Sequence, residues 1–100
     1  MQSTGLHILI TSFLHKGLGR FFQKGDYSGI PAAFSQKIER ILDRLDISVK
    51  PEDMDLPGHK FHPLLGNRKG TYSVTVTGNW RITFKFDGEN AVDVNFEDYH

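Results

Sequence analysis

Five side chains of this 100-residue chain could together perform acid–base chemistry on a phosphate group. They are His62, Arg81, Asp98, Tyr99 and His100. Cleavage of RNA by its own 2′-hydroxyl needs a base for that hydroxyl, a cation for the charged phosphorane and an acid for the departing 5′-oxygen. Two imidazoles, a guanidinium and a carboxylate cover these roles, because histidine exchanges protons near pH 7 and arginine matches phosphate oxygens. Tyr99 could stack on a nucleotide or hydrogen bond to it.

Each of these residues also has an ordinary structural interpretation. His62 stands before Pro63, as turn residues often do, and Arg81 could make a cation–π contact with Trp80 or an ion pair with Glu97. The last three residues could form a solvated tail. The residue types alone leave both interpretations open, because clustered ionisable groups mark functional sites only statistically.

A metal site is disfavoured by the spacing of the candidate ligands. His59, His62, Asp98 and His100 could in principle bind zinc, but the H-K-F-H segment has no compact ligand motif around it. The chain contains no cysteine, which excludes thiolate ligands, disulfides and a thiol nucleophile. We therefore expect neither a metal nor another cofactor.

The charges balance over the whole chain but not along it. Twelve basic and twelve acidic residues give a net charge of zero, so the total predicts no polyanionic partner. Residues 56–86, however, contain no acid and hold Lys60, Arg68, Lys69, Arg81 and Lys85. We expect four of these cations to bind an RNA backbone: Lys60, Arg68, Lys69 and Lys85. The G-N-R-K-G loop lacks the Walker pattern, so it is interpreted as an electrostatic contact only.

Alternating apolar residues in three C-terminal segments predict a β-meander that would bring these groups together. The apolar set is entirely even-numbered: Tyr72, Val74, Val76, Ile82, Phe84, Phe86, Val92, Val94 and Phe96. Pairing even with even residues requires loops of odd length, around G-N-W and D-G-E. The opposite face then collects polar residues and is expected to be open, with Arg81 close to Asn95 and one step from the chain end.

The first half of the chain predicts a strand and two helices. Residues 6–13 are apolar and β-prone, residues 15–25 form a short helix that ends at Gly25, and a longer helix begins at Pro31. We expect one α+β domain over residues 1–100, with two N-terminal helices packed on one face of a small, mainly antiparallel sheet. We expect residues 1–5 to be either disordered or not native. No segment is typical of a membrane span or signal peptide, which predicts a cytoplasmic protein without a membrane partner.

Two stretches of the chain resemble the HigB, or plasmid-maintenance killer, branch of the RelE/ParE toxin superfamily. They are HPLLGNRKGTYSVTVTGNWRITFKF and VNFEDYH, and the similarity runs from about residue 8 to residue 100. The resemblance implies a RelE-like fold and a toxin that cleaves mRNA in the ribosomal A site without a metal. It also implies binding to 16S rRNA and a helix-turn-helix antitoxin, HigA, through which alone the complex contacts operator DNA.

The resemblance places five residues at family active-site positions: His62, Arg81, Asp98, Tyr99 and His100. It implies proton transfer by the two histidines, an orienting or assisting role for Asp98 and stabilisation of phosphate charge by Arg81. The chain departs from the family where Leu65 replaces a lysine that would contact phosphate, although Lys69 adds a charge to the same loop. The alternative is a ParE-like toxin that inhibits DNA gyrase without cutting RNA, which the terminal histidine and aspartate disfavour.

Overall fold

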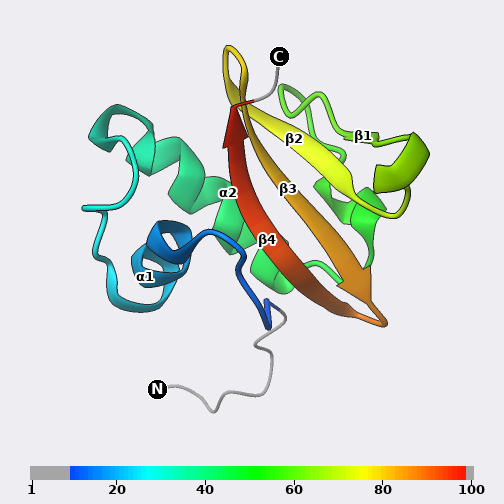
Figure 1. The fold of residues 1–100 in the computed structure, drawn as a ribbon, viewed down its shortest axis with the longest axis horizontal. Coiled ribbons are helices and arrows are strands. Elements are labelled where there is room, and N and C mark those ends of the chain that lie inside the picture. The colour runs from blue at the N-terminus through cyan, green and yellow to red at the C-terminus, as the bar shows by residue number, and fades with distance from the viewer. Residues whose placement is uncertain (1–9, 99–100) are drawn as a thin grey trace.

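The computed structural model describes residues 10–98, in which a four-stranded sheet packs against two helices (Figure 1). The helical elements are α1 (Lys16–Lys24), η1 (Ala32–Phe34), α2 (Ser35–Ile47), η2 (Pro51–Met54) and η3 (Gly66–Arg68), of which the η elements are 3-10 turns. The strands are β1 (His62–Pro63), β2 (Tyr72–Thr77), β3 (Trp80–Asp87) and β4 (Asn90–Asp98). The expected α+β class, with both helices before the meander, is confirmed. The expectation for residues 1–5 lies outside the described residues.

The first helix begins and ends at residues suited to those positions. The His15 Nδ1 atom accepts a hydrogen bond from the Leu18 backbone N–H at 3.0 Å, which satisfies one of the unpaired donors of the first turn. At the other end Gly25 adopts φ 72° and donates its N–H to the Phe21 carbonyl. The predicted helix and its C-terminal glycine are therefore confirmed, and His15 is a capping residue.

The core lies between the helices and the even-numbered face of the sheet. In Figure 1, α2 crosses behind the strands. Leu18 of α1 and the α2 residues Ile38, Ile41, Leu42 and Leu45 are buried together with Val74, Ile82, Phe84 and Val94 of the sheet. The α-helical part of the second helix begins at Ser35 because residues 32–34 form a tighter turn. No helix of residues 10–98 combines the length and apolarity needed to cross a membrane.

The strands pair antiparallel in the order β1-β2-β3-β4, but the predicted odd-length loops are wrong. Thr77 pairs with Trp80 and Asp87 pairs with Asn90, so each hairpin has a two-residue turn. The register shifts between Thr75 and Thr77 in the first hairpin and between Thr83 and Lys85 in the second. A bulge inserts one residue and so exchanges the faces of the strand, which restores the pairing of even with even residues beyond the first turn.

The second bulge moves one predicted core position by one residue. Asp93 adopts φ 53°, and beyond it Phe86 pairs with Ala91 rather than with Val92. Ala91 is fully buried, whereas Val92 is only partly buried. The even-numbered pattern thus correctly predicts Val94 and Phe96 but not Val92, because alternation cannot reveal an inserted residue.

The N-terminal segment lies along the free edge of β4. Ile10 and Phe13 form isolated parallel bridges with Ala91 and Val94, and the Leu14 N–H donates to the Val94 carbonyl at 2.8 Å. This confirms an extended, sheet-bound segment for residues 10–13, although two bridges do not amount to a regular strand. The part of the predicted strand before Ile10 lies outside the described residues.

Two glycines allow α1 to contact the loop before α2 through backbone atoms. A Cβ on Gly17 would lie 2.6 Å from the Gly29 carbonyl oxygen, and a Cβ on Gly29 would lie 2.7 Å from the Gly17 Cα. Backbone on both sides leaves no flexible side chain that could move away. The glycine at position 17 is therefore required by packing, although glycine weakens a helix.

We predict that Gly17→Ala lowers the free energy of unfolding by about 1–3 kcal/mol, the usual cost of forcing extra volume into a packed site. Urea denaturation followed by circular dichroism measures the change. Gly19→Ala in the same helix is the control, because the three heavy atoms nearest its Cβ would all belong to the Phe13 side chain, at 3.4 Å. That variant should be neutral or more stable by up to about 1 kcal/mol. Equal stability of the two variants would contradict the prediction.

Candidate active site

The register of the sheet arranges polar side chains in two rows. The first row contains His62, Ser73, Thr83 and Asn95, and the second contains Thr75, Arg81 and Glu97. Directly opposed residues share a face, so His62 and Arg81 lie on the same face although β2 separates them. Strand spacing puts their Cα atoms about 12 Å apart. A phosphodiester group fits between two side chains at that separation.

This polar face is more covered than the sequence predicts. Ser73, Thr75 and Thr83 are all buried, with 0%, 8% and 1% of their surface exposed. Their short side chains lie beneath longer ones: Arg81 hydrogen bonds to Thr75, and Thr83 hydrogen bonds to Glu97. The expected open face is therefore a layer of hydroxyl groups that carries charged groups above it.

Arg81 extends along its own row toward β2. Its Nη1 atom donates to the Thr75 Oγ1 atom at 2.6 Å and, more weakly, to the Gly78 carbonyl oxygen at 3.4 Å. These contacts hold the guanidinium over β2, the strand that pairs with β1 and therefore lies next to His62. A guanidinium fixed in this way can bind phosphate oxygens without first losing its conformational freedom.

A backbone hydrogen bond sets the tautomer of His62. Its Nδ1 atom lies 3.0 Å from the Lys60 carbonyl oxygen, and Lys60 itself adopts a left-handed φ of 50°. A carbonyl oxygen only accepts, so Nδ1 carries the proton and Nε2 of the neutral ring has a lone pair. The partly buried ring can therefore accept a proton at Nε2.

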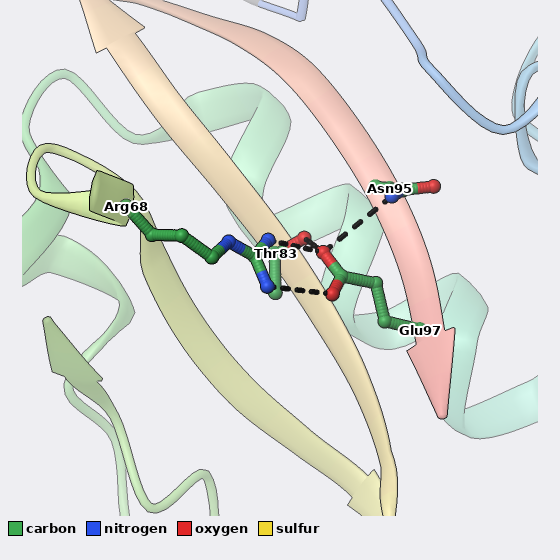
Figure 2. A network of polar contacts seen from close by, with 4 residues as sticks. All are labelled: Arg68, Thr83, Asn95 and Glu97. Carbon is green, nitrogen blue, oxygen red and sulfur yellow. Dashed lines mark hydrogen bonds and ion pairs between the residues drawn. The ribbon is translucent and has the colours of Figure 1, made fainter. Parts of the chain in front are cut away.

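The strongest polar contact of the face joins Arg68 to Glu97 (Figure 2). Arg68 reaches from the loop between β1 and β2, across β3, to donate two hydrogen bonds to the Glu97 carboxylate at 2.9 and 2.6 Å. The Thr83 hydroxyl and the Asn95 amide donate to the Oε2 atom of the same carboxylate. Four donors thus converge on one carboxylate, whose side chain is 19% exposed.

This network lowers the pKa of the Glu97 carboxyl below its ordinary value. The hydrogen bonds from Arg68 are the largest cause, partial burial acts against them, and the Thr83 hydroxyl adds to the lowering. Glu97 is therefore a carboxylate at neutral pH. The Arg68–Glu97 pair carries no net charge.

The remaining predicted RNA-binding cations lie on β3 and on the loops before and after β1. Lys60 precedes β1, Lys69 follows η3 and Lys85 lies in β3, and all three side chains are exposed. Lys85, Arg68 and Glu97 help to line a cavity of about 240 Å³. Its other lining residues are Leu14, Asn67, Thr71, Thr83 and Asp93. The face thus offers a polar hollow next to the Arg81 row.

The structure places only part of the predicted catalytic set. His62 and Arg81 share the polar face, whereas Asp98 lies opposite Trp80 at the exposed end of β4. Strand alternation directs the Cβ of Asp98 away from the face of Glu97 and Arg81. Tyr99 and His100 lie outside the described residues. Within residues 10–98, no three histidine or acidic side chains form a group that could hold a metal ion.

Sequence reasoning did not recognise Glu97 as the centre of the polar network. Its odd number placed it on the correct face, but the expected ion-pair partner was Arg81, the residue directly opposite. Arg68 comes from a loop, and nothing in strand alternation shows how far a loop side chain reaches. His59 was likewise not recognised as structural: its ring contacts the Met54 carbonyl oxygen and its own carbonyl accepts from the Thr75 N–H.

Comparison with known proteins identifies similar chains over almost the whole length. A family model described as the RelE-like toxin of type II toxin–antitoxin system HigB matches residues 11–100. The chain is also 46% identical over 95 residues to Endoribonuclease HigB of Proteus vulgaris. That alignment covers 92% of this chain and 100% of the Proteus protein.

We predict that Glu97→Gln destabilises the protein at pH 7 by about 1–2 kcal/mol, a low value for charge-assisted hydrogen bonds because Arg68 is partly exposed. A carboxyl with a lowered folded-state pKa stabilises the fold above its unfolded-state value, and this contribution is lost as the pH falls through the folded-state pKa. The difference between wild type and variant should therefore shrink below about pH 4.5. Urea unfolding from pH 7 to pH 3 tests this, and a constant difference would contradict it.

Proposed function

The chain belongs to the HigB-like family of RelE-like toxins of type II toxin–antitoxin systems, and we propose that it is an endoribonuclease that cuts mRNA on the ribosome. The observation that carries the proposal is the presence of His62 and Arg81 on one polar face, separated by the width of β2. An acceptor nitrogen and a fixed guanidinium are the base and the cation that RNA cleavage needs. The endoribonuclease name of the Proteus relative supports the same reaction type.

In the proposed reaction the RNA supplies its own nucleophile. His62 Nε2 takes the proton of the 2′-hydroxyl, the freed oxygen attacks phosphorus, and the bond from phosphorus to the 5′-oxygen breaks. The products are a 2′,3′-cyclic phosphate and a 5′-hydroxyl. Arg81 stabilises the charge of the phosphorane, and His100 returns a proton to the leaving oxygen. Asp98, two residues before His100 in the sequence, would orient or assist this transfer from the end of β4 rather than from the face of Arg81, and Tyr99 would hold a nucleotide.

We propose the ribosome as the second half of the active site. A flexible RNA strand must be held with its 2′-oxygen in line with the leaving oxygen, and few groups on this face could do that alone. The exposed Lys60, Lys69 and Lys85 would bind the RNA backbone and 16S rRNA. Arg68 contributes less net charge than its type predicts, because Glu97 neutralises it.

A type II toxin is paired with an antitoxin. We propose a HigA-like helix-turn-helix protein in this role, with operator DNA bound only through it. A toxin that acts on translating mRNA would act in the cytoplasm, which agrees with the absence of a membrane-crossing helix in residues 10–98.

We predict that Arg81→Ala lowers cleavage of ribosome-bound mRNA about 100- to 1000-fold, the usual effect of removing one preorganised group that stabilises transition-state charge. Arg81→Lys should retain part of the activity, because it keeps the charge but loses the bidentate geometry. Mapping of mRNA 5′ ends after induced expression measures the loss. Arg20→Ala is the control, since Arg20 is exposed on α1 and forms an exposed ion pair with Asp26 at 3.7 Å.

Wild-type protein should produce cuts in phase with codons and should be nearly inactive on free RNA. Strong cleavage of free RNA would contradict the proposed dependence on the ribosome. Growth arrest with DNA damage and without mRNA cuts would instead support inhibition of gyrase. Full activity of Arg81→Ala would remove Arg81 from the proposed site.

We predict that Leu65→Lys increases cleavage about 3- to 10-fold, and more at low salt, because an added cation near phosphate strengthens RNA binding. Leu65 is 83% exposed in the loop before η3, so the change should leave stability nearly unaltered. Cleavage rates at two salt concentrations measure the effect. Ile47→Lys is the control, since Ile47 is also exposed and lies at the end of α2. An equal increase in both variants would show that only total charge matters.

A further inference from the structure

Arg68 and Arg81 stand on either side of one carboxylate. The register places Arg81 directly opposite Glu97 on the polar face, a position at which Cβ atoms of opposed residues lie about 4.5–5.5 Å apart. An arginine and a glutamate in this relation readily form an ion pair. In the structure, however, both carboxylate oxygens of Glu97 accept hydrogen bonds from Arg68.

The contacts of the two guanidiniums differ in direction. Arg68 reaches over β3 to Glu97 (Figure 2). The Nη1 atom of Arg81 instead turns toward Thr75 on β2 and toward the turn at Gly78. Thr83 and Asn95 also hold the carboxylate on the Arg68 side. The polar network thus decides which guanidinium the carboxylate neutralises.

We propose that Arg68 is a positioning residue, which binds Glu97 so that the carboxylate does not neutralise the Arg81 guanidinium needed for phosphate. This inference rests on the proposed endoribonuclease function. Arg68 then acts through Glu97 and Arg81 rather than through contact with the reacting atoms. Without Arg68, the Glu97 carboxylate turns to Arg81, and the phosphate must compete with it.

A purely structural ion pair would predict a different pattern of variants. Suppose that the pair only held the loop of residues 64–71 to β4. Removal of Arg68 or of Glu97 would then lower the cleavage rate equally, and removal of both would not restore it. The proposed role predicts suppression: loss of Arg68 is harmful only while Glu97 keeps its charge. Non-additivity of this kind is expected for residues that share one network.

The test measures single-turnover cleavage of ribosome-bound mRNA by the full-length protein and five variants, one of which is a surface control. We expect Arg68→Ala to lower the rate about 10- to 100-fold, as a displaced catalytic group does. Glu97→Gln should stay within about 3-fold of wild type, and the double variant Arg68→Ala/Glu97→Gln should recover to within about 3-fold as well. Arg68→Lys should be intermediate, because an ammonium cannot bind both carboxylate oxygens in the planar geometry of a guanidinium. Arg20→Ala again serves as the surface control.

A second measurement reports on the pairing without using activity. The nitrogen-15 signal of the Arg81 side chain should move in Arg68→Ala and return in the double variant, while thermal melting shows that each variant is folded. A double variant as slow as Arg68→Ala, or an Arg81 signal that stays unchanged in Arg68→Ala, would overturn the inference. Wild-type protein that leaves ribosome-bound mRNA intact would instead overturn the proposed function.

Discussion

The register of the sheet is fixed from its buried side. Val74, Ile82, Phe84 and Val94 are fully buried against the helices, and burial of each such side chain is worth about 1.5–3 kcal/mol. A slip of one residue would expose this set and exchange the two faces of a strand. The position of Arg81 opposite Glu97 is therefore determined by apolar packing on the other side of the same strands. The polar face needs no packing of its own to be arranged correctly.

On the polar face itself, hydrogen bonds and an ion pair determine how the long side chains are oriented. Hydroxyl side chains at Thr75 and Thr83 are small enough to lie beneath the charged groups, and each accepts or donates one hydrogen bond that directs a longer neighbour. Larger residues at these positions would occupy the space that the arginines cross. A layer of short hydroxyl groups thus permits the guanidinium of Arg68 to reach Glu97 and that of Arg81 to extend over β2.

Sequence patterns predicted the elements better than the connections between them. The helical spacing of Ile38, Ile41 and Leu45 and the alternation in β2 and β3 indicate which side chains are buried, and the family resemblance agrees with the family match. The bulge at Asp93 was not predictable, because an inserted residue leaves no mark in alternation. Nor was the pairing of Arg68 with Glu97, since it depends on the reach of a loop side chain across β3 (Figure 2).

The edge contact of the N-terminal segment has a consequence for the order in which the fold forms. Thr11 and Leu14 hydrogen bond to Ala91 and Val94, so the first described segment binds the edge of β4. Thr11 and Ala91 are 80 residues apart in the sequence, whereas each hairpin joins its strands through a two-residue turn. Contacts between distant residues close a longer loop and form more slowly than local ones. The hairpins that carry Arg81 and Glu97 can therefore form before the edge of β4 is covered.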